Sequence, residues 1–129
     1  MASQLAGSAP GFTIDPDRSA RLIRYRLQGL WDRDMHNRYR DASIAEMRKF
    51  HAAGVPFNML GDLRDFKTQA QDMNDQRQDL VKTALGLGLN KCAIILASSI
   101  VKMQLSRLTS TDAIAFFTSE DEAKAWLGI

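Results

Sequence analysis

Hydrophobic positions along the chain follow two periods, one of two residues and one near 3.6 residues. Short apolar or alternating runs are typical of strands, and apolar residues three and four positions apart are typical of helices. Together they predict an α/β fold with the element order β-β-α-β-α-β-α-β-α. The predicted strands lie at residues 12–14 and 20–27, in the first part of 55–66, and at 91–97 and 112–117. The first two strands should form a hairpin.

Residues 55–66 (VPFNMLGDLRDF) form the centre of this arrangement. A mostly apolar strand runs there into a charged loop, with a helical pattern on each side, which is typical of a parallel strand inside a sheet. Asp62, Arg64 and Asp65 are then predicted at the carboxyl end of that strand, where open α/β sheets usually hold their sites. They form either a local ion-pair network that orients the loop or a polar recognition site for a partner or small ligand. Paired carboxylates perform acid–base catalysis only where their surroundings separate their pKa values.

The helical patterns have recognisable starts. Asp32 is a predicted N-cap for a first helix with an inward stripe at Met35, Tyr39, Ala42, Glu46, Phe50 and Ala53. Later helices are predicted to begin after Thr68, at Ser98-Ser99 and after Ser119. Because the N-terminus of a helix attracts anions, these starts could form an anion-binding rim along one edge of the sheet. Ordinary capping is the alternative.

Composition places the chain among soluble globular proteins. It has 129 residues, of which 45% are hydrophobic and 25% charged. We expect a flexible tail at residues 1–11 and a single domain at 12–129. The net charge of +2 gives no reason to expect a nucleic-acid partner, but residues 17–49 contain nine basic and five acidic residues, a local net charge of +4. That excess is either a solvated face or a patch for an acidic partner or anionic headgroup.

Few residues suggest covalent or metal chemistry. Cys92 is the only cysteine and lies in an apolar run, which predicts a buried thiol and a reducing compartment. His36 and His51 lack the spacing of metal ligands, and no phosphate-binding loop, dinucleotide fingerprint or nucleophile elbow is present. We therefore expect no metal, no cofactor, no catalytic residue and no enzymatic activity. Trp31 is the best candidate for a partner contact, since tryptophan often anchors interfaces.

Localisation follows by default. No apolar run approaches the roughly 18 residues of a membrane span, and the first residues lack the basic start and apolar core of a signal peptide. The sequence thus predicts a cytoplasmic protein without a membrane span.

Three local patterns carry a resemblance. They are LQGLW at residues 27–31, GDLRD at 61–65 and FFTSEDEAKAWL at 116–127. With the element order, they resemble the SpoIIAA-like proteins of the STAS/SEC14 group over nearly the whole chain after about residue 11. The resemblance implies a mixed sheet of four or five strands, built as a βα superhelix with helices mainly on one face.

The group also implies two functions. Its anti-anti-sigma factors are bacterial regulatory proteins that bind other proteins and are switched by phosphorylation of a serine after the central strand. Asp62 matches their aspartate, but residues 68–75 contain no serine, and Thr68 is the only hydroxyl there. The leading hypothesis is a non-enzymatic regulatory or protein-interaction module without that switch, whose partner is another protein or a second copy in a homodimer.

The alternative is a small carrier similar to SEC14 domains, which holds an apolar or anionic ligand in a crevice between sheet and helices. SEC14 domains are much longer and have a helical lid that this chain lacks. A regulatory module should show little or no pocket and an exposed patch at residues 68–75 or at Trp31. A carrier should show an apolar cavity, lined for example by Met59, Met73, Leu80 and Met103.

Overall fold

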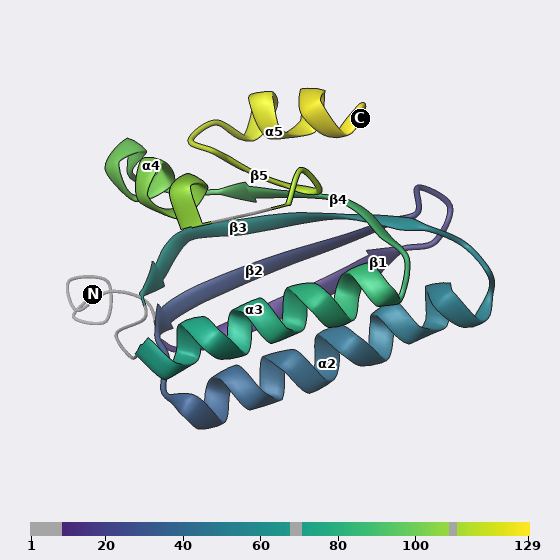
Figure 1. Ribbon diagram of the computed structural model, residues 1–129, viewed down its shortest axis with the longest axis horizontal. Coiled ribbons are helices and arrows are strands. Elements are labelled where there is room, and N and C mark those ends of the chain that lie inside the picture. The colour runs from purple at the N-terminus through teal and green to yellow at the C-terminus, as the bar shows by residue number, and fades with distance from the viewer. Residues whose placement is uncertain (1–8, 68–70, 109–110) are drawn as a thin grey trace.

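A five-stranded sheet with helices on both faces forms the protein (Figure 1). The computed structural model describes residues 9–67, 71–108 and 111–129. In chain order the elements are β1 (Gly11–Asp17), β2 (Leu22–Leu30), α2 (Arg33–Ala52), β3 (Phe57–Lys67), α3 (Gln71–Gly86), β4 (Leu89–Ile95), α4 (Ser99–Leu108), β5 (Ile114–Phe117) and α5 (Glu120–Leu127). This order confirms the predicted α/β fold.

The strands lie side by side in the same order as in the sequence, β1-β2-β3-β4-β5. β1 and β2 form the predicted antiparallel hairpin, in which Ile14 lies opposite Tyr25. Every other neighbouring pair is parallel. Each parallel connection passes through a helix, as parallel strands require.

Alternating side chains divide the interior into two cores. On β2, Ile23, Tyr25 and Leu27 belong to the larger core, beneath α2 and α3. Leu22 points to the opposite face and packs in a smaller core with Ala123 and Leu127 of α5. Figure 1 shows α2 and α3 running side by side along one face, with α5 on the other. The two longest helices therefore share one face, as predicted, and α5 covers part of the other.

Helix α2 begins as predicted and faces the core along a slightly different line. The Asp32 side chain accepts a hydrogen bond from the Met35 backbone N–H at 2.9 Å, which confirms the N-cap. The buried positions are Tyr39, Ser43, Met47 and Phe50. The predicted stripe was wrong at Ala53, which caps the end of the helix and is exposed. Ala42 and Glu46 are only partly buried, because the inward line includes a serine that a search for apolar residues passes over.

Strand β3 is longer than the sequence suggested. The strand was predicted to run into a charged loop within residues 55–66, but the charged residues continue the strand, which pairs with β2 as far as Lys67 opposite Leu30. Pairing with β4 stops where Asp62 meets Ile95. Beyond that point β3 pairs with β2 only. Its charged side chains are therefore accessible to solvent although the backbone continues as a strand.

Helix α4 is the least buried of the described helices. Leu105 packs against the larger core, whereas Ile100, Val101 and Met103 are exposed. None of the helices in the described residues is both long and apolar enough to cross a membrane.

Candidate functional site

The charged residues near the end of β3 form an ion-pair network. Arg64 donates from Nε and from one terminal nitrogen to the two carboxylate oxygens of Asp62, each at 2.9 Å. Its terminal nitrogen also lies 3.5 Å from Glu120 of α5, and Glu120 pairs with Lys124 at 3.0 Å. The network thus links β3 to α5 on the side of the sheet opposite the larger core.

A second pair lies beside it. Arg26 of β2 contacts the carboxylate of Asp65 at 2.6 Å, next to the irregularity in β2–β3 pairing between Arg26 and Gln28. Asp62, Arg64 and Asp65 are therefore close together, as predicted, but each is engaged in an ion pair. This geometry matches the ion-pair alternative, and a role of these residues in recognition stays a prediction.

Electrostatics in this network favour charged carboxylates. Hydrogen bonds from Arg64 hold the pKa of Asp62 below its ordinary value, and Lys124, with Arg64, does the same for Glu120. A general acid at neutral pH needs a carboxyl whose pKa is raised. The surroundings of Asp62 and Glu120 act in the opposite direction.

The helix starts satisfy their own backbone groups. The Ser98 hydroxyl accepts from the Val101 N–H at 3.4 Å, and the Ser119 hydroxyl accepts from the Glu122 N–H at 3.3 Å. Ser99 is exposed, and Thr68 lies outside the described residues. The first turn of α5 also carries Glu120, Asp121 and Glu122, which repel anions. The geometry supports ordinary capping at Ser98 and Ser119 and gives no support to an anion-binding rim.

Trp31 is a core residue. Its side chain is only 3% exposed, and its indole N–H donates to the Gln28 carbonyl at 2.8 Å. The ring packs edge-on against Tyr39 and Phe66. The prediction that Trp31 anchors a partner was wrong, because the aromatic residues around it leave almost no surface for contact.

Cys92 is buried in mid-strand, as predicted. Its sulfur lies 3.5 Å from the hydroxyl oxygen of Tyr25, and burial raises the pKa of the thiol to about 11. The neutral thiol is a poor nucleophile. No cluster of three or more histidine, cysteine, aspartate or glutamate side chains suited to a metal is found in the part of the chain that the structure describes.

An apolar cavity of about 290 Å³ lies between the sheet and helices α2 and α3. The sheet contributes Tyr25, Leu27, Met59, Leu63, Leu89, Cys92, Ile94 and Ile114 to its lining. The helices contribute Tyr39, Met47, Arg77, Gln78, Leu80, Val81, Lys82, Ala84 and Leu85, and Thr111 lies at the edge before β5. Met59 and Leu80 were predicted to line such a cavity, and they do.

The other two residues predicted to line the cavity, Met73 and Met103, are not among its described lining residues. The Met103 side chain is 57% exposed on α4 and does not belong to the lining. The side chain of Met73 lies outside the described part of the chain. The cavity is therefore formed by α2 and α3 rather than by α4, which the sequence pattern could not show.

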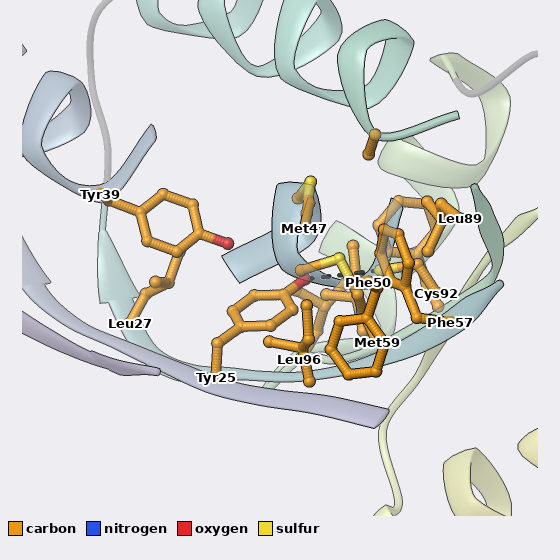
Figure 2. Packing of buried hydrophobic residues seen from close by; sticks show 14 of the residues in the cluster. Tyr25, Leu27, Tyr39, Met47, Phe50, Phe57, Met59, Leu89, Cys92 and Leu96 are labelled. Atoms are coloured by element: carbon orange, nitrogen blue, oxygen red, sulfur yellow. Dashed lines mark hydrogen bonds between the residues drawn. The ribbon is translucent and has the colours of Figure 1, made fainter. Parts of the chain in front are cut away.

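A few polar groups enter this apolar space. Tyr25 and Tyr39 lie with ring centroids 5.8 Å apart, and Figure 2 shows both hydroxyl ends among the buried side chains. Burial raises the pKa of both phenols, so both stay protonated. The charged groups in the described lining are Arg77 and Lys82, and that lining contains no carboxylate.

Gly61 explains how Tyr25 fits against the sheet. The two residues lie opposite each other on β2 and β3, and a Cβ atom placed on Gly61 would overlap the Tyr25 ring. A glycine inside a strand often marks such a close approach. The sequence did not point to Tyr25, Tyr39 or Arg77 as lining residues of a cavity, although Tyr39 was expected to face the core. A glycine in the middle of an apolar strand was the available signal for Tyr25.

Comparisons with known proteins identify the fold. Neither a protein-family model nor a curated protein sequence matches the chain. The structure is similar to the crystal structure of an uncharacterized protein of the DUF3478 family with a SpoIIAA-like fold from Shewanella loihica PV-4, with a TM-score of 0.70 and 14% sequence identity. The similarity covers 94% of this chain and 97% of that one. The fold is therefore SpoIIAA-like, as the resemblance implied.

Proposed function

We propose that this SpoIIAA-like domain is a non-enzymatic carrier that binds a small, mainly apolar molecule between its sheet and helices α2 and α3. The observation that supports this most is the apolar cavity of about 290 Å³. It lies near the lower end of the range of about 300–1,000 Å³ for small-molecule sites. Such sites combine an apolar lining with a few polar groups that fix the orientation of the ligand.

The cavity also favours the carrier over the regulatory module. That module should show little or no pocket and an exposed patch at residues 68–75 or at Trp31, whereas the cavity is sizeable and Trp31 is buried. Its other predicted surface, residues 68–75, includes Thr68, Gln69 and Ala70, which lie outside the described residues. Apolar side chains that line an empty space lose dispersion contacts, which an apolar ligand would restore.

The size of the cavity limits the ligand. A water molecule occupies about 30 Å³ of the liquid, so the space suits a molecule on the order of ten non-hydrogen atoms. A neutral alcohol of that size, 1-octanol, is a suitable first probe. We expect saturable binding by isothermal titration calorimetry, with chemical-shift changes at Met59, Leu80 and Val81.

A matched pair of variants tests the location. Val81 lines the cavity on α3, whereas Val101 is exposed on α4 and lies outside the lining. We expect Val81→Phe to fill the cavity and weaken octanol binding at least tenfold, and Val101→Phe to bind like the wild type. Absence of octanol binding by the folded wild-type protein, or equal binding by Val81→Phe, would contradict the proposal.

A protein-interaction module is the second candidate, for one specific reason. Ile100 and Met103 of α4 are 68% and 57% exposed, respectively, and neither belongs to the cavity. Exposed apolar side chains grouped on one helix are a feature of contact surfaces. Sedimentation of the wild type and of an Ile100→Ser/Met103→Ser variant tests this interaction. If a second copy of the chain binds through α4, the wild type should sediment as a dimer and the variant as a monomer.

A further inference from the structure

We infer that the ligand of the cavity is an amphipathic anion, a carboxylate on a short apolar chain, whose head lies beside Arg77. This inference rests on the proposed function and adds the chemical class of the ligand. It follows from the distribution of charge and polarity in the cavity lining.

The described lining of the cavity carries positive charge and contains no carboxylate. Arg77 and Lys82 are the charged residues of the described lining, and both belong to α3. Asp62 and Asp65 pair with Arg64 and Arg26 on the opposite side of β3.

Of the two cations, Arg77 is better placed to bind a carboxylate in the cavity. Its side chain is partly buried, whereas Lys82 is exposed. Burial lowers the pKa of Arg77, but a guanidinium remains charged at neutral pH because its ordinary pKa is above about 12. Charge-assisted hydrogen bonds from guanidinium to carboxylate are stronger where water is partly excluded. With five N–H donors, Arg77 can hold a carboxylate while keeping its interactions within the protein.

Two polar side chains that share the cavity with Arg77 are neutral. Tyr25 and Cys92 line the same cavity and stay protonated, because burial raises the pKa of each. A hydroxyl can donate a second hydrogen bond to a carboxylate. The remaining lining, formed by residues such as Met47, Met59, Leu80 and Leu89, suits an alkyl or aryl tail.

Octanoate and 1-octanol form a matched pair of probes, because they share a chain length and differ in the charge of the head. We expect the wild-type protein to bind octanoate at least about tenfold more tightly than octanol at pH 7, since a charge-assisted hydrogen bond is worth at least that factor. Calorimetry gives both affinities on the same protein without any substitution.

Substitutions then locate the head. Arg77→Met should abolish the preference for octanoate over octanol, whereas Arg77→Lys should keep part of that preference. Arg48→Met is the control, because Arg48 is exposed on α2 and lies outside the lining. It should behave like the wild type, and circular dichroism checks that each variant is folded.

The outcomes separate the two proposals. Octanol binding without a preference for octanoate would overturn the anionic ligand and leave the carrier intact. Failure of the wild-type protein to bind either probe would overturn both. A preference for octanoate that survives in folded Arg77→Met would place the head elsewhere and contradict the role of Arg77.

Discussion

The contact between Gly61 and Tyr25 makes one position of β3 intolerant of even a methyl group. A Cβ atom at Gly61 would overlap the Tyr25 ring, so the ring must move in Gly61→Ala. We expect a loss of about 1–3 kcal/mol in the free energy of unfolding, typical of overpacking, measured by urea denaturation. Because Tyr25 lines the cavity, octanol binding should also weaken.

Gly86→Ala is the matched control. Gly86 ends α3, and a Cβ atom there meets nothing within 4 Å. Alanine should leave the stability unchanged or raise it slightly, by up to about 1 kcal/mol. Equal stabilities of Gly61→Ala and the wild type would show that the ring is free to move and that the contact does not constrain β3.

Cys92 offers a probe of the cavity that needs no substitution. It is the only cysteine, it lines the cavity, and burial raises its pKa to about 11. At pH 8 the native thiol should therefore react with a disulfide reagent far more slowly than the thiol of the urea-unfolded chain. Saturating octanol should slow the reaction further. A native rate equal to the unfolded rate would contradict the burial.

At the scale of elements, helix α4 has two sides with different consequences for stability. Ile100 is 68% exposed, whereas Leu105 packs against the larger core. We expect Ile100→Ser to change the free energy of unfolding by less than about 0.5 kcal/mol and Leu105→Ser to lower it by more than about 1 kcal/mol. Thermal denaturation of both variants compares them, and equal losses would mean that α4 packs differently.

The elements themselves were largely predictable because their signals are local. Asp32 and Ser119 cap their helices as expected, and the hairpin and the element order are confirmed. The end of β3 was not predictable, because residues 62–67 stay in the strand through pairing with β2. In the sequence, a run of charged residues is interpreted as a loop when the strand that pairs with it is not known.

The candidate site was less predictable than the elements. Met59 and Leu80 were expected in a cavity, but Tyr39 and Arg77 enter it only because α2 and α3 lie together over the same face of the sheet. Trp31 looked like a surface anchor because no local pattern shows the aromatic residues that cover it. Packing between segments that are distant in the sequence determines both the lining of the cavity and the burial of Trp31.

At the scale of the whole molecule, the ion pairs between β3 and α5 predict how stability depends on pH. Arg64 lowers the pKa of Asp62 in the folded state, so Asp62 contributes stability above its ordinary pKa of 3.8 and loses it as the pH falls through the lowered value. Asp62→Asn should cost up to about 1 kcal/mol at pH 7, since the pair is partly exposed.

The difference between Asp62→Asn and the wild type should stay constant from pH 7 to about pH 5 and shrink below the ordinary pKa of 3.8. Melting temperatures across this range measure it. Asp41→Asn, at an exposed pair with Arg40, should follow the wild-type curve. A constant difference down to pH 2.5 would contradict the lowered pKa.

The agreement between strand order and chain order has a consequence for synthesis of the protein. Each strand after β1 pairs with the strand that precedes it in the chain. Its pairing partner has therefore already been synthesised when the strand leaves the ribosome. Each parallel pair of strands is then joined by a single helical crossover, which is the usual connection between parallel strands. β1 to β3, with α2 packed on them, can form while β5 is still inside the exit tunnel. The sheet can thus grow from β1 to β5 in the direction of translation, with the newest strand as its growing edge.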